Sequence, residues 1–166
     1  MYLIIVNLLI LLKMRYKYLI IIFLFFFSCK PIEPVDFVEI KNVNINNSIN
    51  NKINISADIV LNNPNKVKII IDNVNLDIYA EDIILVNIDE NQSRELSESS
   101  QTTVNITGEV NLKNLEDFLN KKGLAIILGN DDVSLKFIGK IEAKAYGIKD
   151  EINIDYSINS VKGLIN

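Results

Sequence analysis

Carboxylates are the side chains in this sequence whose type and spacing could support catalysis or metal binding. Asp58, Asp72 and Asp77 could include a carboxylate pair of the kind used by glycoside hydrolases. The clusters Asp89-Glu90-Asn91 and Asn130-Asp131-Asp132 offer oxygen ligands for calcium, but neither has the spacing of an EF-hand loop, which favours solvated turns. The three aspartates fall on predicted strand faces that see solvent. We therefore predict no catalytic residue, no metal site and no cofactor.

The composition excludes several other kinds of site. Histidine and tryptophan are absent from the 166 residues, and Cys29 is the single cysteine. This removes Ser-His-Asp and Cys-His arrangements, most zinc sites and any intramolecular disulfide. Of the 17 Lys and Arg residues three precede Cys29, whereas all 21 Asp and Glu residues follow it, so the chain after Cys29 is strongly acidic. Because no basic patch is present to neutralise phosphates, we predict no nucleic-acid partner.

Cys29 follows a segment with the order of a secretory signal. Arg15 and Lys17 precede an apolar run over residues 18–27, and the small Ser28 comes directly before the cysteine. This order resembles the lipobox of bacterial lipoproteins, in which the cysteine is diacylated and becomes the new N-terminus. The resemblance implies a signal peptide over residues 1–28, lipidation of Cys29 and a lipidated tether over residues 29–35. The apolar run is shorter than the roughly 20 residues that cross a bilayer as a helix.

A second apolar run, over residues 1–13, precedes this signal. Three interpretations stay open: translation starts at Met14, the signal is unusually long, or the two runs form a short membrane hairpin.

Two acyl chains on Cys29 would hold the chain stably in the cell envelope. Lys30 follows the cysteine in place of the Asp that favours inner-membrane retention in some bacteria, which points to the outer membrane in an organism with two membranes.

Alternation of apolar and polar residues dominates the chain from residue 36 onward and predicts antiparallel strands with one buried face. Ile55 and Ile154 are expected to face inward, and Asp58 and Asp155 outward. The alternation changes phase at Asp72-Asn73, and again between residues 40 and 43, which predicts β-bulges.

Three further segments complete the predicted architecture. The apolar run 83–88 predicts a central strand, and the polar run 89–101 predicts a loop. Apolar residues at spacings of three and four predict a helix near residues 114–122, capped by Asn114 and stopped by Gly123. About seven strands with one short helix indicate an all-β domain, a β-sandwich of immunoglobulin or fibronectin type III architecture over residues 36–160, followed by a C-terminal tail over residues 161–166.

The tripeptide Asn63-Pro64-Asn65 lies between two alternating strands. It could be a binding turn, but turn chemistry explains it better, because Pro fixes φ and Asn side chains hydrogen-bond to the local backbone. We therefore interpret Asn63, Pro64 and Asn65 as a structural turn.

Two stretches resemble the LEA type 2 family, also called the water stress and hypersensitive response (WHy) domain. The first, INISADIVLNNPNKVKIIIDNVNLDIYAEDI, carries the Asn-Pro-Asn turn that members of this family have after an early strand. The second, VSLKFIGKIEAKAYGIKDEINIDYSI, resembles the C-terminal pair of strands. The resemblance implies a β-sandwich linked to desiccation and stress tolerance. It also implies an exported lipoprotein, as bacterial members often are, with no catalytic residues to carry over.

Three classes of function follow. The first is a membrane-anchored lipoprotein with a non-catalytic binding or protective domain, active in desiccation or envelope stress tolerance. The second is a structural or assembly lipoprotein that binds an envelope protein partner. The third, a hydrolase that uses carboxylates alone, is disfavoured because histidine, repeated acidic motifs and Gly-rich loops are missing. The predicted partners are thus the membrane, through the lipid anchor, and an envelope protein.

Overall fold

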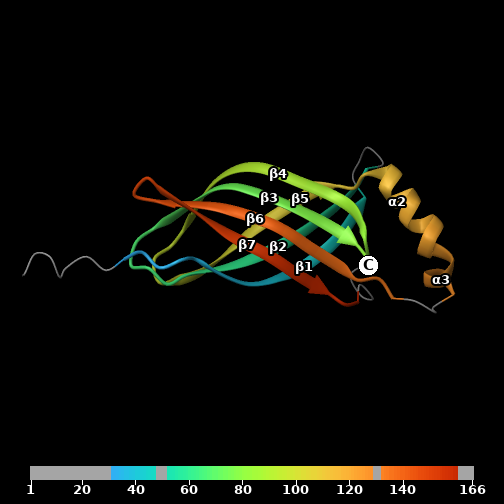
Figure 1. Cartoon of the computed structure of the whole chain (residues 1–166), viewed down its shortest axis with the longest axis horizontal. Coiled ribbons are helices and arrows are strands. Elements are labelled where there is room, and N and C mark those ends of the chain that lie inside the picture. The colour runs from blue at the N-terminus through green and yellow to red at the C-terminus, as the bar shows by residue number, and fades with distance from the viewer. Residues whose placement is uncertain (1–30, 48–51, 129–131, 161–166) are drawn as a thin grey trace, which may run out of the picture. The chain divides into compact units, whose positions relative to one another are not determined.

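A computed structural model describes residues 31–47, 52–128 and 132–160 (Figure 1). The chain divides into two compact units, Met1–Ile32 and Glu33–Asn166, and the fold described here is that of the second unit. Cys29, the predicted signal peptide, Lys30 of the tether, Asn130, Asp131 and the C-terminal tail lie outside the described residues.

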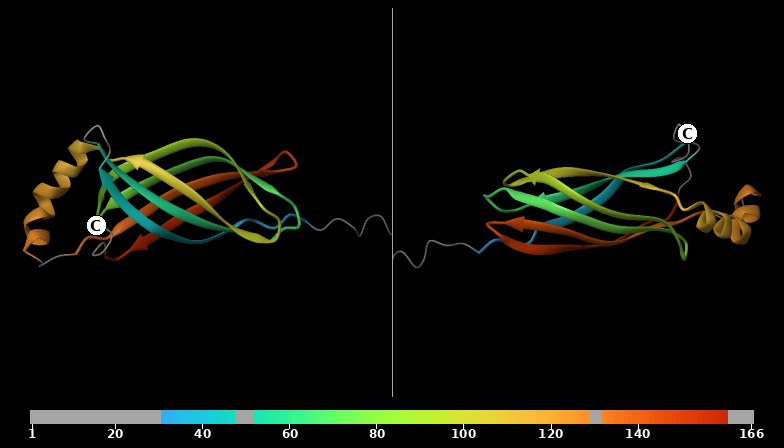
Figure 2. Two further views of the ribbon diagram at one scale, coloured as in Figure 1. Left: turned by 180° about the vertical axis from the view of Figure 1, so that it is seen from behind. Right: turned by 90° about the horizontal axis from the view of Figure 1, so that it is seen from above.

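The second unit is a two-sheet β-sandwich of seven strands, as the alternation predicts. One sheet has the strand order β1-β2-β5 and the other β4-β3-β6-β7, and every neighbouring pair is antiparallel. Figure 2 shows the two sheets as layers, with a helical segment beyond one end of them. The strands are β1 Asp36–Asn47, β2 Ile53–Asn63, β3 Ile69–Ala80, β4 Ile83–Leu96, β5 Ser100–Glu109, β6 Leu135–Ala145 and β7 Ile148–Ile158.

The core lies between the inner faces of the two sheets, where the sequence places it. Ile55 on β2 is 1% exposed and Ile154 on β7 is 2% exposed, whereas Asp155 faces solvent. Both predicted phase changes are register shifts in the structure, between Ile71 and Asn73 on β3 and between Lys41 and Asn44 on β1. The first shift lets both Ile71 and Val74 reach the core.

The prediction for residues 83–101 is wrong in two respects. The run 83–88 belongs to β4, which is an edge strand of its sheet and not a central one. Of its extra apolar residues, Leu85 is buried and Ile84 is 37% exposed. The helical segment and its connection pack on β4 here, and the Asn111 N–H donates to Leu85 O at 2.8 Å. The polar run is mostly strand as well, with only residues 97–99 left between β4 and β5. Most side chains from 89 to 95 are exposed, so polar residues are tolerated on both faces of this part of the strand.

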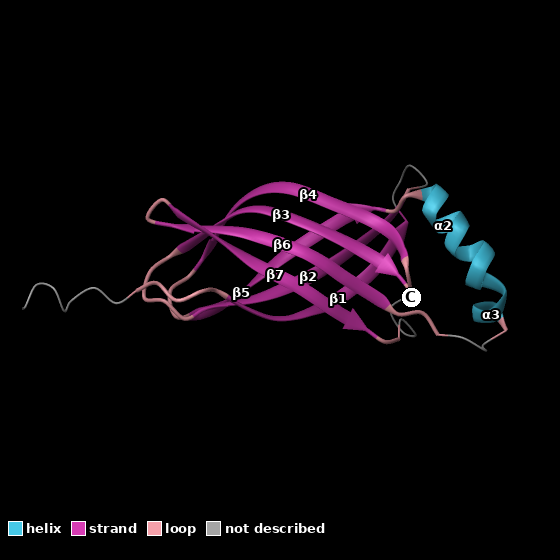
Figure 3. Cartoon of the chain, in the orientation of Figure 1, coloured by secondary structure: helices cyan, strands magenta, loops and turns pink. Residues whose placement is uncertain are grey.

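The helical segment is longer than the predicted 114–122. It consists of α2 Leu112–Phe118, a π-helical turn η1 Leu119–Gly123, and α3 Leu124–Ile127 (Figure 3). Asn111 is the N-cap in place of Asn114, and its Oδ1 accepts the N–H groups of Lys113 and Asn114. Gly123 does not stop the helix, because it keeps a helical φ of −53°.

Candidate functional site

The predicted turn residues tie the start of the sandwich to two of its loops. The side-chain amide of Asn65 binds the backbone of Glu33 twice: Oδ1 accepts the Glu33 N–H at 2.7 Å, and Nδ2 donates to Glu33 O at 2.8 Å. Asn63 is fully buried and donates from Nδ2 to Val67 O at 2.8 Å and to Ser97 O at 3.0 Å. Its Oδ1 accepts the backbone N–H of Asn65 at 3.0 Å. These bonds use the two amides within the protein, which is the arrangement of a structural turn.

Loss of the Asn65 amide should loosen the N-terminal connection. Asn65→Ala removes both bonds to Glu33 and one donor to Asn63, and we expect a loss of about 1–3 kcal/mol in the free energy of unfolding. Hydrogen exchange at the Glu33 amide should accelerate. Asn62→Ala is the matched control, since the hydrogen bond given for its side chain among the described residues is an exposed one of 3.3 Å to Asp36, and this variant should change stability by about 0.5 kcal/mol or less. Equal losses in the two variants would contradict this role for Asn65.

Asp58, Asp72 and Asp77 do not form a carboxylate pair, since each is held by different partners. Asp58 lies on β2, in the other sheet from Asp72 and Asp77, and accepts hydrogen bonds from Asn105 and Asn42. Those two bonds lower the pKa of Asp58 below its usual value. Asp77 accepts from Asn87 Nδ2 at 2.6 Å. A general acid needs a raised pKa, so a lowered one at Asp58 does not fit that role.

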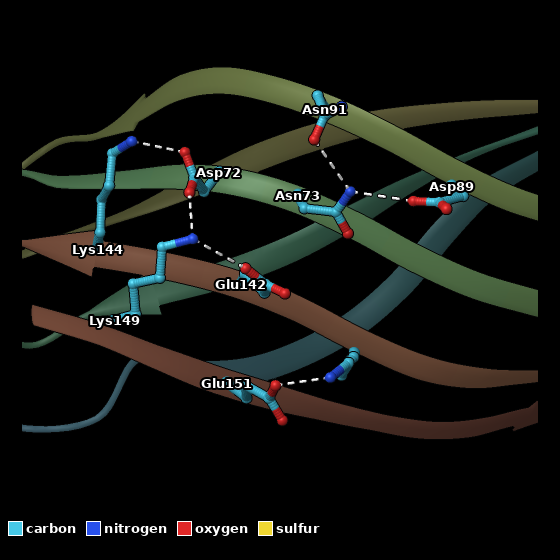
Figure 4. Close-up of polar contacts among 9 residues, drawn as sticks. Asp72, Asn73, Asp89, Asn91, Glu142, Lys144, Lys149 and Glu151 are labelled. Carbon is cyan, nitrogen blue, oxygen red and sulfur yellow. Dashed lines mark hydrogen bonds and ion pairs between the residues drawn. The ribbon is translucent and has the colours of Figure 1, made fainter.

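Asp72 belongs to an ion cluster on the outer face of the larger sheet (Figure 4). Lys144 Nζ lies 2.6 Å from Asp72 Oδ1, and Lys149 Nζ lies 2.9 Å from Oδ2 and 3.3 Å from Glu142 Oε2. The bulge in β3 turns Asp72 outward toward these lysines of β6 and β7. Hydrogen bonds donated by Lys144 and then Lys149 lower the pKa of Asp72 to about 2. The hydrogen bonds that Lys149 donates to Asp72 and then to Glu142 raise the pKa of Lys149. The cluster joins three strands and leaves Asp72 ionised at neutral pH.

The Asp72 cluster predicts an acid-sensitive component of stability. Because the pKa of Asp72 is about 2 in the folded state against an ordinary 3.8, its contribution is present above about pH 4 and is lost as the pH falls toward 2. A carbon-13 NMR titration of the Asp72 carboxyl group should give this pKa directly. Lys144→Met should shift the titration toward the ordinary range. An unchanged midpoint in this variant would contradict the assignment.

The described members of the two acidic clusters bond to neighbouring groups of the protein. Asp89 and Asn91 lie on β4, where both side chains accept from Asn73 Nδ2, at 3.1 and 3.4 Å (Figure 4). Asp132 Oδ1 accepts the N–H of Val133, while its predicted partners Asn130 and Asp131 lie outside the described residues. Within residues 31–47, 52–128 and 132–160, no group of three or more His, Cys, Asp or Glu side chains could hold a metal ion.

The two ends of the sandwich differ in the side chains they expose. We call the end at which Glu33 joins the fold the proximal end; it also carries residues 64–68, 97–99 and the β6–β7 turn at Tyr146-Gly147. The opposite end, which carries the helical segment, is the distal end (Figure 1). A groove of about 590 Å³ at the proximal end is lined by Lys66, Val67, Lys68, Ile70, Glu95, Glu98, Lys144, Ala145, Tyr146 and Gly147.

The distal end carries a row of exposed aliphatic side chains, which we call the aliphatic stripe. Its members are between 51% and 83% exposed: Leu112, Leu119, Leu124, Ile127 and Leu128. Leu112 and Leu119 are two α-helical turns apart, Leu119 and Leu124 are one π-helical turn apart, and Ile127 and Leu128 follow one α-helical turn later. The π-helical turn thus keeps all five on one side of the helix, while Phe118 packs into the core.

This stripe does not follow from the helix predicted near residues 114–122, because that helix ends at Gly123. Leu112, Leu115, Phe118 and Leu119 fit one apolar helical face in the sequence, but only Leu115 and Phe118 face the core. The apolar residues at 124–128 were a usable signal, since a helix continued through Gly123 brings them onto the side of Leu119.

Among the described residues, the helices are too short or too polar to span a bilayer.

Comparisons with known proteins identify a family and two solved structures with a similar fold. The family model LEA_2, late embryogenesis abundant protein, matches residues 58–159. A crystal structure of a protein from Archaeoglobus fulgidus aligns with a TM-score of 0.55 and 13% sequence identity, over 75% of this chain and 98% of that one. The solution structure of an Arabidopsis thaliana protein aligns with a TM-score of 0.62 and 13% identity, over 80% of this chain and 86% of that one. At this identity the two structures show a shared fold alone. No curated protein matches the chain.

Proposed function

Because the chain belongs to the LEA_2 family of late embryogenesis abundant proteins, we propose that it is a lipid-anchored, non-catalytic protective module of the cell envelope. The proposal joins three features: the basic, apolar, Ser28-Cys29 order of the N-terminus, the family's link to stress tolerance, and the aliphatic stripe. The stripe is the observation that carries it. Drying and osmotic shock expose apolar surface on other proteins, and the stripe offers that surface a non-covalent contact in place of aggregation.

The position of the stripe suits a module held from its other end. The strands run 10 to 14 residues, so at about 3.3 Å per residue the stripe stands roughly 35–45 Å from the proximal end. A chain anchored at Cys29 would therefore present the stripe away from its membrane. The acidic character of the chain after Cys29 opposes adsorption of the domain to anionic lipid and keeps it soluble between encounters.

The protective role is tested with the domain detached after residue 29. Wild-type domain should preserve the activity of a test enzyme through dehydration, and Leu124→Gln with Ile127→Gln should lose most of that protection. Ile148→Gln is the matched control, because Ile148 is an aliphatic residue 67% exposed at the proximal end, close to the 72% of Leu124. Melting temperatures should be similar in all three. Full protection by the double variant would rule out the stripe as the contact surface.

The cellular role is tested in the organism itself. A deletion strain should lose viability on drying or osmotic shock, and the wild-type gene should restore it where the Leu124→Gln, Ile127→Gln gene does not. Labelled palmitate should enter the wild-type protein and not Cys29→Ser. Robust turnover of a glycan, peptide or ester by the purified domain, abolished by one Asp or Glu substitution, would overturn a non-catalytic role.

One edge strand favours a second candidate, an assembly lipoprotein that binds an envelope protein by strand addition. From Ser100 to Gly108, the edge strand β5 has no charged residue. The other edge strands, β1, β4 and β7, carry charged residues, which usually disfavour pairing with a strand of another chain. Arg94 Nη1 donates to Thr103 O at 3.2 Å, so Arg94→Ala would open this edge further. Cross-linking in cells that captures one dominant partner through β5, with no effect of drying on a deletion strain, would favour assembly over protection.

A further inference from the structure

The turn between β6 and β7 places a bulky aromatic residue in a backbone conformation that suits small ones. Ala145 pairs with Ile148, so Tyr146 and Gly147 form a two-residue hairpin loop. Both have positive φ, +50° at Tyr146 and +81° at Gly147, which is the pattern of a type I′ turn. Asn, Asp or Gly is the favoured residue at the first of these positions, and a tyrosine there is strained. The turn itself therefore gives no reason for tyrosine.

Packing does not explain the tyrosine either. Tyr146 is 82% exposed, and the next side chain in the hairpin, Ile148, is 67% exposed. We call Tyr146, Gly147 and Ile148 the hairpin tip. An aromatic and an aliphatic side chain side by side on a protruding tip stabilise little in the folded domain. Strained, exposed positions of this kind are found where a protein makes contacts outside itself.

The hairpin tip lies at the end from which the chain leaves toward Cys29. Tyr146 and Lys66 line the same groove, Lys66 follows Asn65, and Asn65 holds the backbone of Glu33. Figure 2 shows the β6–β7 turn and the start of the described chain at the same end of the sheets. Only three residues separate Glu33 from Cys29, so the Cα atoms of these two residues are at most about 14 Å apart when the chain is fully extended. A lipid on Cys29 would hold this end of the domain against the bilayer.

We propose that the hairpin tip docks on the phospholipid surface that holds the anchor, with the Tyr146 ring and the Ile148 side chain in the interfacial layer. This rests on the proposed lipidation of Cys29. Tyrosine suits that layer, because its ring is apolar while its hydroxyl stays hydrated. Contact occurs through apolar insertion, since two of the groove's three lysines are paired, Lys68 with Glu95 and Lys144 with Asp72, and Glu98 lines the groove as a further carboxylate. Docking is thus insensitive to salt and leaves the aliphatic stripe free at the distal end.

The absence of tryptophan from the chain allows a direct test. The full-length lipoprotein with Tyr146→Trp, reconstituted in phosphatidylcholine vesicles, carries a single indole at the tip. Its emission should be blue-shifted, and lipids brominated in the acyl chains should quench most of it at both low and high salt. The same chain with Leu124→Trp is the matched control, since Leu124 is 72% exposed at the distal end, and its emission should be quenched little.

Two further variants separate docking from folding. Adding Ile148→Asn to Tyr146→Trp should cut the quenching severalfold by removing the second apolar side chain. Tyr146→Asn should leave the melting temperature unchanged or raise it, because asparagine suits the turn. A lower melting temperature for Tyr146→Asn would mean that the tyrosine serves the fold and would overturn the proposal. Equal quenching at positions 146 and 124 would also overturn it.

Flotation on a density gradient separates failure of the anchor from failure of the tip. If wild type does not float with vesicles, or if Cys29→Ser floats equally well, lipidation is wrong and docking of the tip falls with it. If wild type floats, Cys29→Ser does not, and the indole at position 146 is unquenched, the anchor stands and docking of the tip alone is overturned. A tip captured by cross-linking to a protein, with no lipid quenching, would likewise reject a lipid surface.

Discussion

Phe137→Ala should lower the free energy of unfolding by about 3–5 kcal/mol, as other large aromatic truncations in cores do. Phe137 is fully buried on the inner face of β6, a strand that pairs on both sides with β3 and β7. Truncation removes apolar contacts with both sheets and leaves a cavity that central strands cannot collapse to fill. Urea denaturation followed by circular dichroism measures the loss.

The neighbouring residue provides the control for Phe137. Ile138 is adjacent in sequence but points to the other face of the sheet, where it is 37% exposed. Ile138→Ala should therefore cost less than about 1 kcal/mol, since it leaves no enclosed cavity. A larger loss at Ile138 than at Phe137 would mean that the register of β6 is shifted by one residue, which would exchange the two faces of the strand.

Gly139→Ala should destabilise the fold by about 3 kcal/mol, at the upper end of what overpacking costs. A Cβ at Gly139 would collide with Asn75 O and would lie 2.8 Å from Leu76 Cα. Both are backbone atoms of the paired strand β3, so no side-chain rotation relieves the clash. β6 would have to move away from β3 and lengthen hydrogen bonds near the middle of the larger sheet.

Gly123 is the matched control for Gly139. A Cβ there would meet only Leu119 side-chain atoms, at 3.6 Å, which is an ordinary van der Waals contact. Since Gly123 is helical, Gly123→Ala should stabilise the domain by up to about 1 kcal/mol. Thermal melts of the two variants should thus shift in opposite directions. A shift of the same sign and size in both would contradict the close approach of β6 to β3.

Features that depend on near neighbours in the chain were predictable from the sequence. Alternation with a period of two assigns strands and their inner faces, so Ile55 and Ile154 were placed in the core, and the phase change at Asp72-Asn73 identified the bulge. The bonds of the Asn63 side chain to backbone two and four residues away are local in the same way, whereas its bond to Ser97 and the bonds of Asn65 to Glu33 join segments more than 30 residues apart. The N-terminal order that points to Cys29 is likewise a local pattern, and it stays a prediction.

Features that depend on how distant segments meet were decided by the tertiary structure alone. An apolar run such as 83–88 fits both a strand at the centre of a sheet and an edge strand covered by a helix. Only the strand order shows that β4 is an edge strand. The partners of Asp72 are 72 and 77 residues away, so their meeting depends on the register of β3, β6 and β7. The aliphatic stripe arose because packing on the sandwich sustains a helix through Gly123 and exposes the side that packing leaves uncovered. The sequence by itself thus determined the strands that alternate between apolar and polar residues and the side chains of those strands that face the core, because periodicity is local. It did not identify the mostly polar residues 89–96 as strand, because they lack that alternation. The edges, the ion cluster and the exposed surfaces required the three-dimensional pairing of segments far apart in the chain.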